Sequence, residues 1–292
     1  MIRDLGVVGA GTTGRGIVQT AAQAGIKVVF CEISDEKVAE AIAGITAALD
    51  REIERWGLTK TEKTVILSRI RGTTTYEELK VAPLVIEAVR ENLGLKSEVL
   101  QALDKVLPPE TIFITNTSSL SITQLAAVTN RSDRVVGMHF LSPVPKRPLV
   151  EVVRGLHTSD ETVKQVKEFA SDISKSAIEV FEYPGFVTTR LILPLLNEAM
   201  HVVMEGVASA NDVDAAMTLG YNFPNGPLEI ADRIGLDEVL LWMEHLFREL
   251  GDLKYRPCPL LRKMVRAGHL GVKTGRGFFL YDERGRRAKE KV

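Results

Sequence analysis

The chain has 292 residues, of which 37 are basic and 38 acidic, so its formal net charge is −1. That length supports a large core and two domains, and the balanced charge favours neither nucleic acid nor an anionic membrane as a partner. Two cysteines, Cys31 and Cys258, provide no disulfide framework and no metal-binding spacing. Because there is also no apolar run of membrane-spanning length and no leader peptide in the first residues, we expect a cytoplasmic protein without a bound metal.

A strand, a glycine-rich turn and a helix are predicted at the start of the chain. The apolar run at 5–8 leads into Gly-x-Gly-x-x-Gly, and a helical pattern of apolar residues follows. In this context the first glycine permits a tight turn, the second lets the backbone approach a pyrophosphate, and the third lets the helix pack closely on the strand. The amino terminus of the helix offers unpaired N–H groups to the phosphates. The predicted cofactor contacts in this turn are Gly9, Gly11, Thr12, Thr13 and Gly14.

The next strand, predicted over 27–32, ends in a carboxylate. An acid at this position of a dinucleotide-binding unit accepts hydrogen bonds from the adenosine ribose, and its charge repels a 2′-phosphate. Glu32 therefore favours NAD over NADP as the cofactor. The alternative is that Glu32 is an ordinary solvated strand end.

Three helices and five further strands are predicted after this unit. Ser34 and Thr59 are predicted N-caps of helices over 34–55 and 59–69, which form a hairpin inserted after the second strand. A crossing helix is predicted over 95–106. The remaining strands are predicted at 85–89, 112–115, 135–140, 149–153 and 177–181.

Two structure breakers, Pro184 and Gly185, follow the last predicted strand and mark a domain boundary. Before it, residues 1–183 are predicted to form a Rossmann-type α/β domain with the helical hairpin as an insertion. After it, residues 184–292 are predicted to form an all-α domain, whose apolar excess indicates more burial than one small domain provides. Its helices are predicted over 187–207 with a kink at Pro194, from Asn211 or Asp212 onward, and over 236–250.

Polar side chains stand at the ends of several apolar runs. The run Asn116-Thr117-Ser118-Ser119 follows one predicted strand, and His139 and Glu151 lie in the next two. Polar groups at strand ends in an open α/β sheet lie where ligands bind. A histidine that pairs with a carboxylate on a neighbouring strand is a candidate acid/base unit, with one ring nitrogen held and the other used for proton transfer. The alternative is a satisfied buried histidine near an edge carboxylate.

The chain resembles the L-3-hydroxyacyl-CoA dehydrogenase family, and within it the bacterial 3-hydroxybutyryl-CoA dehydrogenases. The similarity implies NAD-dependent oxidation of an L-3-hydroxyacyl-CoA to the 3-oxoacyl-CoA, and the reverse reaction, with short-chain 3-hydroxybutanoyl-CoA as the expected substrate. It also implies a homodimer formed through the second domain. The matching segments run almost end to end and include 9–17, 85–96, 115–120, 137–151, 184–186, 197–199, 212–220, 226–229 and 273–278.

The resemblance also assigns roles to individual residues. His139 and Glu151 correspond to the family's catalytic pair, and Ser118 corresponds to a serine that hydrogen-bonds the 3-oxygen of the substrate. Glu91 and Lys96 correspond to positions at the cofactor, near the nicotinamide ribose, with a solvated helix lysine as the alternative for Lys96. Asn116 is expected to position the nicotinamide or the substrate, or else only to form the turn.

Two positions depart from the family pattern. Thr189 stands where the family has an asparagine that contacts the substrate oxygen, and Ser142 replaces an asparagine of the histidine loop. We expect the Thr189 hydroxyl to make that contact, and the two changes to retune the pocket without abolishing catalysis. Arg51 and Arg55 of the hairpin are candidates for contacts to coenzyme A, with a solvated helix face as the alternative.

Two other functions stay open at this point. One is NAD-dependent oxidation of a free hydroxy acid such as L-gulonate on the same fold; relatives that use a catalytic lysine are disfavoured because residues 187–207 contain none. The other is a non-catalytic, crystallin-like protein. The presence of His139, Glu151 and Ser118 counts against that second alternative.

Overall fold

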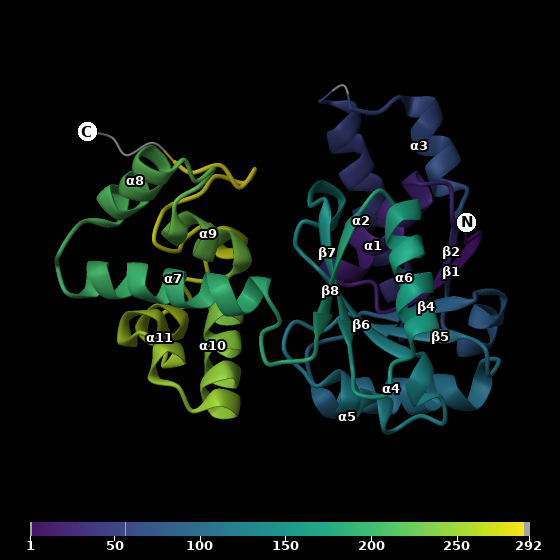
Figure 1. Cartoon of the computed structure of the whole chain (residues 1–292). Coiled ribbons are helices and arrows are strands. Elements are labelled where there is room, and N and C mark those ends of the chain that lie inside the picture. Colours follow the sequence, from purple (N-terminus) through teal and green to yellow (C-terminus); the bar gives the residue numbers. More distant parts are fainter. Residues whose placement is uncertain (1, 56, 289–292) are drawn as a thin grey trace. The chain divides into compact units, whose positions relative to one another are not determined.

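The computed structural model describes residues 2–55 and 57–288 (Figure 1). The chain divides into two compact units, of which the first ends at Tyr183 and the second begins at Pro184. Directly after the division, Gly185 has a φ of +80°, a left-handed conformation that glycine adopts without a steric penalty. The pair of breakers seen in the sequence thus stands where one unit gives way to the next.

The first unit is built on an eight-stranded sheet with the strand order β3-β2-β1-β4-β5-β6-β7-β8. Neighbouring strands are parallel except β6 and β7, which are antiparallel. The central strands are buried along their length, as expected for parallel strands covered by helices. The strands are β1 (Asp4–Val8), β2 (Lys27–Cys31), β3 (Ile70–Thr73), β4 (Leu84–Glu87), β5 (Ile112–Thr115), β6 (Val135–Phe140), β7 (Leu149–Arg154) and β8 (Ser176–Phe181).

Six α-helices accompany this sheet in the described residues. Two of them form the predicted hairpin, which projects from the rest of the unit (Figure 1). Ser34 caps the first hairpin helix, and Thr59 forms a capping box with Glu62 at the start of the second. The helices are α1 (Thr12–Gln23), α2 (Asp35–Ile53), α3 (Lys60–Leu67), α4 (Leu93–Val106), α5 (Ile122–Ala126) and α6 (Asp160–Asp172).

The second unit is helical and has its own apolar core. Leu193 and Leu196 of its first helix pack in that core with Met243 and Leu246. This first helix continues through Pro194. The helices are α7 (Thr188–Met204), α8 (Ala210–Tyr221), α9 (Pro227–Ile234), α10 (Leu236–Leu250) and α11 (Pro259–Arg266).

A buried carboxylate ties the end of the second unit to α9. Asp232 accepts hydrogen bonds from the N–H groups of Phe278 at 2.9 Å and Phe279 at 3.0 Å, and from the hydroxyl of Tyr281 at 3.0 Å. Glycine is needed at position 277, because a Cβ on Gly277 would lie 1.9 Å from an Asp232 oxygen. Burial raises the pKa of Asp232. This carboxylate therefore serves packing within the second unit.

The predicted fold class, a Rossmann-type domain with a helical hairpin followed by a helical domain, is confirmed. Several elements or their bounds differ from the prediction, and two of the differences have a clear physical reason. The edge strand β3 is absent from the predicted strands because Arg71 and Gly72 interrupt any apolar run, and its pairing with β2 defines it instead. Helix α8 begins before Asn211, because Ser209 is its N-cap and accepts from the Asp212 N–H at 3.2 Å.

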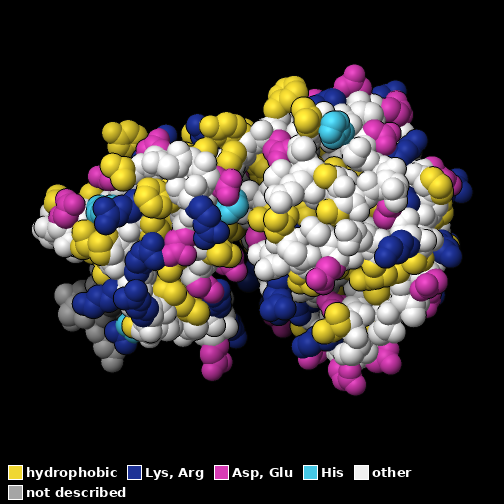
Figure 2. All heavy atoms as spheres, turned by 90° about the horizontal axis from the view of Figure 1, so that it is seen from below, with side chains coloured by type: hydrophobic (Ala, Val, Ile, Leu, Met, Phe, Trp, Pro, Cys, Tyr) yellow, Lys and Arg dark blue, Asp and Glu magenta, His cyan; other side chains and the backbone are white. Residues whose placement is uncertain are grey.

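The cysteines and the surface agree with the composition. Both cysteines are buried free thiols, and burial raises the pKa of Cys31 to about 11, so Cys31 belongs to the core of the sheet. Acidic and basic side chains lie interspersed on the face drawn in Figure 2. Within the described part of the chain, no helix is both long and apolar enough to cross a lipid bilayer.

Candidate active site

The glycine turn between β1 and α1 has the geometry of a phosphate-binding loop. Gly9 has a φ of +87°, and a Cβ on Gly14 would lie 1.9 Å from the Gly9 carbonyl oxygen. A Cβ on Gly11, by contrast, would meet no atom within 4 Å. Gly9 and Gly14 therefore shape the turn, whereas Gly11 leaves space in which a ligand can approach the backbone.

The amino terminus of α1 belongs to the same turn. Its N-cap is Gly11, and no side chain of the described residues caps the first N–H groups. The first turn, which begins with Thr12 and Thr13, also contains no acidic side chain. The N–H donors and the partial positive charge of the helix end are thus available to an anion. These residues fit the pyrophosphate of NAD.

Glu32 follows β2 and is bonded to the glycine turn. Its Oε1 accepts a hydrogen bond from the Ala10 N–H at 2.5 Å, and its Oε2 accepts from the Ile33 N–H at 3.2 Å. The half-buried carboxylate is therefore part of the turn rather than a solvated strand end. From this position an acid can reach a ribose next to a pyrophosphate held by the turn.

Strands β6 and β7 place His139 and Glu151 directly opposite each other. The antiparallel register pairs the two residues, so their side chains lie on the same face of the sheet. His139 Nδ1 lies 2.6 Å from Glu151 Oε2, and the two side chains are 7% and 0% exposed. Because a carboxylate this deeply buried depends on its partner, the two groups form one unit in which Nδ1 is held.

The loop after β5 lies at the same edge of the sheet, since β7 runs opposite to β6 and begins where the parallel strands end. In this loop, Ser118 donates to Glu91 Oε1 through its N–H at 3.0 Å and through its hydroxyl at 3.2 Å. The same oxygen accepts from the hydroxyls of Thr117 at 2.5 Å and Ser119 at 3.1 Å. The fold therefore brings together Glu91 and Ser118, which the sequence places 27 positions apart.

Asn116 connects the β5 loop to the histidine strand. Its side-chain Oδ1 accepts from the N–H of Phe140, the residue after His139, at 3.2 Å. Its backbone carbonyl accepts from Lys96 Nζ at 3.2 Å. Asn116 is thus more than a turn-forming residue, because it links the end of β5 to the end of β6.

A second buried ion pair lies beneath these loops, and sequence analysis missed half of it. Glu87 and Lys96 are both fully buried, with Lys96 Nζ 2.8 Å from Glu87 Oε1 and 3.1 Å from Oε2. Burial raises the pKa of the Glu87 carboxyl, although the Lys96 ammonium opposes that effect. The alternative of a solvated helix lysine at position 96 is therefore wrong. The available signal was an acid closing a buried apolar strand, which charges rarely occupy without a partner.

The remaining predicted residues lie elsewhere in the fold. Thr189 is in the second unit, near the start of α7, and is 2% exposed. Arg51 in the last turn of α2 and Arg55, two residues after the helix ends, are both exposed. Ser142 is exposed in the loop after β6, where its carbonyl accepts from Arg147 Nε at 3.2 Å. The roles expected of these residues rest on the family resemblance.

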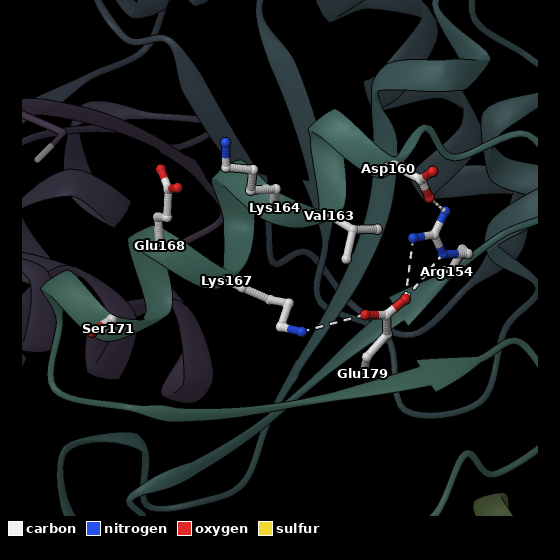
Figure 3. Close-up of a pocket in the computed structure, with 8 residues that line it drawn as sticks. All are labelled: Arg154, Asp160, Val163, Lys164, Lys167, Glu168, Ser171 and Glu179. Atoms are coloured by element: carbon white, nitrogen blue, oxygen red, sulfur yellow. Dashed lines mark hydrogen bonds and ion pairs between the residues drawn. The ribbon is translucent and has the colours of Figure 1, made fainter.

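An open hollow lies over α6 and the strands beside it (Figure 3). Arg154 bonds Asp160 at 2.7 Å and Glu179 at 3.1 Å, and Lys167 bonds Glu179 at 3.3 Å. These charges are paired within an exposed network, which offers neither a buried acid/base group nor a phosphate-binding turn. The sheet edge that carries His139, by contrast, has a buried histidine and carboxylate in contact.

Comparison with known proteins points to one family. The model of the 3-hydroxyacyl-CoA dehydrogenase NAD binding domain matches residues 4–183, and the model of the C-terminal domain of 3-hydroxyacyl-CoA dehydrogenase matches residues 185–281. A probable 3-hydroxybutyryl-CoA dehydrogenase of Bacillus subtilis is 50% identical over 283 residues, or 97% of this chain and 99% of that protein. A probable 3-hydroxybutyryl-CoA dehydrogenase of Deinococcus radiodurans is 46% identical over 276 residues, or 94% and 99%. The crystal structure of (S)-3-hydroxybutyryl-CoA dehydrogenase from Ralstonia eutropha has a TM-score of 0.90 at 48% identity, covering 97% of this chain and 100% of that chain.

Proposed function

The chain belongs to the 3-hydroxyacyl-CoA dehydrogenase family, and we propose that it interconverts L-3-hydroxybutanoyl-CoA and acetoacetyl-CoA with NAD as its cofactor. The observation that carries this proposal is the buried contact of 2.6 Å between His139 Nδ1 and Glu151 Oε2. In this contact His139 is the base that takes the proton of the substrate's hydroxyl group, and Glu151 holds it in place. The names of the similar proteins support the short acyl chain.

The glycine turn would hold NAD, which would supply the hydride acceptor for oxidation of the alcohol and, as NADH, the hydride donor for the reverse reaction. His139 takes the hydroxyl proton at Nε2, because Nδ1 is engaged with Glu151. Glu151 keeps the ring in one tautomer and stabilises the imidazolium that forms. In the reduction direction, the same imidazolium returns the proton to the oxygen.

Ser118 is proposed to donate a hydrogen bond to the 3-oxygen of the substrate. Its hydroxyl donates to Glu91 Oε1 at 3.2 Å, so it has to turn from Glu91 to reach the substrate. The hydroxyls of Thr117 and Ser119 continue to satisfy Glu91 when this happens. Turning the Ser118 hydroxyl therefore costs little free energy, because the Glu91 carboxylate keeps its other hydrogen-bond donors.

The proposal is tested by following NADH oxidation with 3-oxoacyl-CoAs of increasing chain length, beginning with acetoacetyl-CoA. The expected result is the highest kcat/KM with the shortest substrates, and no oxidation of L-gulonate or hydroxyisobutyrate in the forward assay with NAD. Tight NADH binding without turnover of any acyl-CoA would instead identify a non-catalytic relative. Preferred oxidation of a free hydroxy acid would also refute the proposal.

The same assay with NADPH tests the proposed role of Glu32. Its carboxylate is held beside the turn by the Ala10 N–H at 2.5 Å, where it repels a 2′-phosphate. We expect NADH to be preferred in the wild type, and the Glu32→Ala variant to lose part of that preference. A preference of the wild type for NADPH would overturn this role.

Coenzyme A contacts are proposed for Arg51 and Arg55, whose exposed guanidinium groups can pair with phosphates. The Arg51→Gln and Arg55→Gln variants are expected to raise KM for acetoacetyl-CoA and to leave kcat unchanged. An unchanged KM in both variants would leave the arginines on a solvated helix face.

A homodimer formed through the second unit is also proposed. Three apolar side chains of this unit, Val207, Leu219 and Tyr221, are 72%, 84% and 73% exposed, and contact with a second copy would bury such groups. Light scattering of the purified chain is expected to give twice the monomer mass, and a monomer mass would refute the dimer.

We also propose a cytoplasmic location. Both cysteines are buried thiols outside any disulfide, as is usual in a reducing compartment. Cell fractionation tests this proposal.

A further inference from the structure

The buried ion pair of Glu87 and Lys96 lies beneath the two loops that carry Glu91 and Ser118. We propose that this pair is a positioning device for the reaction: it fixes the loop after β4 against the loop after β5, and so sets where Ser118 and His139 stand. Neither residue of the pair touches the reacting atoms in this account. The inference rests on the proposed function, because it concerns the geometry of the same site.

Each member of the pair bonds groups at the carboxyl ends of both β4 and β5. Glu87 accepts from the Val89 N–H at 2.7 Å, after β4, and from the Thr115 hydroxyl at 2.7 Å, at the end of β5. Lys96 donates to the carbonyl oxygens of Val89 at 3.3 Å and Asn116 at 3.2 Å. A single pair of charges therefore holds the backbone of the two loops together.

These loops lead directly to the reacting groups. The side chain of Asn116 accepts from the N–H that follows His139, at 3.2 Å, so a shift of the β5 loop moves the end of the histidine strand. Glu91 accepts a hydrogen bond from the Ser118 hydroxyl, and its Oε2 lies 3.7 Å from Lys96 Nζ. The position of Lys96 thus affects both the serine and the histidine side of the site.

The surroundings of Lys96 fit a role in holding the two loops. Its ammonium has three N–H donors, and four protein oxygens lie at 2.8 to 3.3 Å from it. The side chain is 0% exposed. Lys96, which family resemblance places at the cofactor, thus also bonds the backbone of both loops.

The pair is expected to add little to the free energy of unfolding, which favours a role for it in function. Desolvation offsets most of the attraction in a buried ion pair, and well-packed apolar residues of similar volume often stabilise a fold as well or better. Apolar residues cannot, however, replace directional hydrogen bonds to Val89, Thr115 and Asn116. The pair therefore supplies geometry that apolar packing would not.

The test is the double variant Glu87→Leu/Lys96→Met in the full chain. We expect it to fold with a lower thermal midpoint, because the Val89 N–H and the Asn116 carbonyl lose their partners, and its NADH dissociation constant to change little. Its kcat for acetoacetyl-CoA reduction should fall about 10²-fold, because small misplacements of catalytic groups have effects of that size. A folded double variant with kcat within about twofold of the wild type would overturn the inference, since it would reduce the pair to a structural element.

A matched control lies at the opposite end of β5, where the strand begins. Arg131 and Asp104 form another buried pair, 7% and 5% exposed, and Arg131 donates to the carbonyl of Thr111, just before β5. The Asp104→Leu/Arg131→Met variant is expected to retain kcat even where its thermal midpoint falls. An equal loss of kcat in this control would also overturn the inference, because it would show a general response to lost buried charges.

The single variant Glu87→Gln decides the case if the double variant does not fold. Its amide keeps the shape of the carboxylate but removes the charge that Lys96 faces, so we expect kcat to fall about tenfold with KM for NADH little changed. An unchanged kcat would refute positioning. A wild-type chain that is inactive on acetoacetyl-CoA would overturn the proposed function and this inference with it, whereas an active wild type with an equally active variant would overturn the inference alone.

Discussion

The glycine turn between β1 and α1 presents main chain and open space, whereas the sheet edge at β4 to β7 presents side chains that are buried and already bonded. At the turn, the groups offered to a ligand are N–H donors of a helix end, and Gly11 contributes the absence of a side chain. At the edge, His139 is bonded to Glu151 and Lys96 to Glu87, all of them nearly or fully inaccessible to water.

This difference determines which changes each region tolerates. The turn requires glycines without a Cβ atom, so an added methyl group lowers its stability or its affinity for the cofactor. Which of the two falls depends on the space around each glycine. The edge depends on hydrogen bonds between buried groups, so a change of donor or acceptor damages it even when the shape is kept. Changes at the turn should therefore affect cofactor binding, and changes at the edge should affect turnover.

The largest effect is expected for His139→Gln. Removal of the base should lower kcat for acetoacetyl-CoA reduction by about 10³-fold, within the range of general acid–base catalysis. Because the glycine turn is untouched, the NADH dissociation constant from fluorescence titration should stay the same. A variant that keeps its turnover, or that loses turnover only through weaker NADH binding, would break the comparison.

A smaller but mixed effect is expected for Gly14→Ala. Its new methyl group would meet the Gly9 carbonyl oxygen at 1.9 Å, so the helix has to move, at a cost of about 2 kcal/mol in the free energy of unfolding. A loss of that size in binding would weaken NADH about thirtyfold. Urea unfolding and NADH titration check the two parts. Unchanged stability would mean that the turn is not closely packed.

The matched variant Gly11→Ala distinguishes an effect on cofactor binding from an effect on the stability of the fold. The new methyl group meets no protein atom within 4 Å, and the φ of −65° suits alanine. We expect urea unfolding to show unchanged stability, while NADH titration shows about tenfold weaker binding, equal to about 1.4 kcal/mol. Unchanged NADH affinity would remove Gly11 from the cofactor site.

The smallest effect is expected for Thr189→Ala. If its hydroxyl supplies the contact that the family makes with an asparagine, loss of one neutral hydrogen bond should lower kcat about fivefold. The Thr189→Ser variant, which keeps the hydroxyl, should restore most of the rate. Full turnover in Thr189→Ala would remove this residue from the catalytic set and leave the chemistry to the sheet edge.

Local patterns in the sequence were sufficient for the turn. The spacing of Gly9, Gly11 and Gly14 between an apolar strand and a helix encodes its conformation within a few residues, and the caps at Ser34 and Thr59 are equally local. The pairing of His139 with Glu151 required more, because it depends on the antiparallel register of β6 and β7. The position of both residues in neighbouring predicted strands and the family resemblance made that pairing predictable.

The buried pair at Glu87 and Lys96 was beyond local reasoning. Lys96 stands in an amphipathic helix, where most lysines face water, and its burial arises only when the loops after β4 and β5 close over it. Glu87 is one acid at the end of an apolar run, and its partner is nine positions away in another element. The strand β3 was missed for a similar reason, since pairing with β2 rather than apolar pattern defines it.

The measurement that tests the central claim most directly is a single-turnover reduction of acetoacetyl-CoA by enzyme-bound NADH in the wild type and in Glu151→Gln. Glutamine keeps the size of the side chain that lies 2.6 Å from His139 Nδ1 but cannot stabilise the imidazolium. We expect an NADH dissociation constant like that of the wild type and hydride transfer slowed by about 10²-fold. A variant that transfers hydride at the wild-type rate would contradict the assignment of His139 and Glu151 as the acid/base pair.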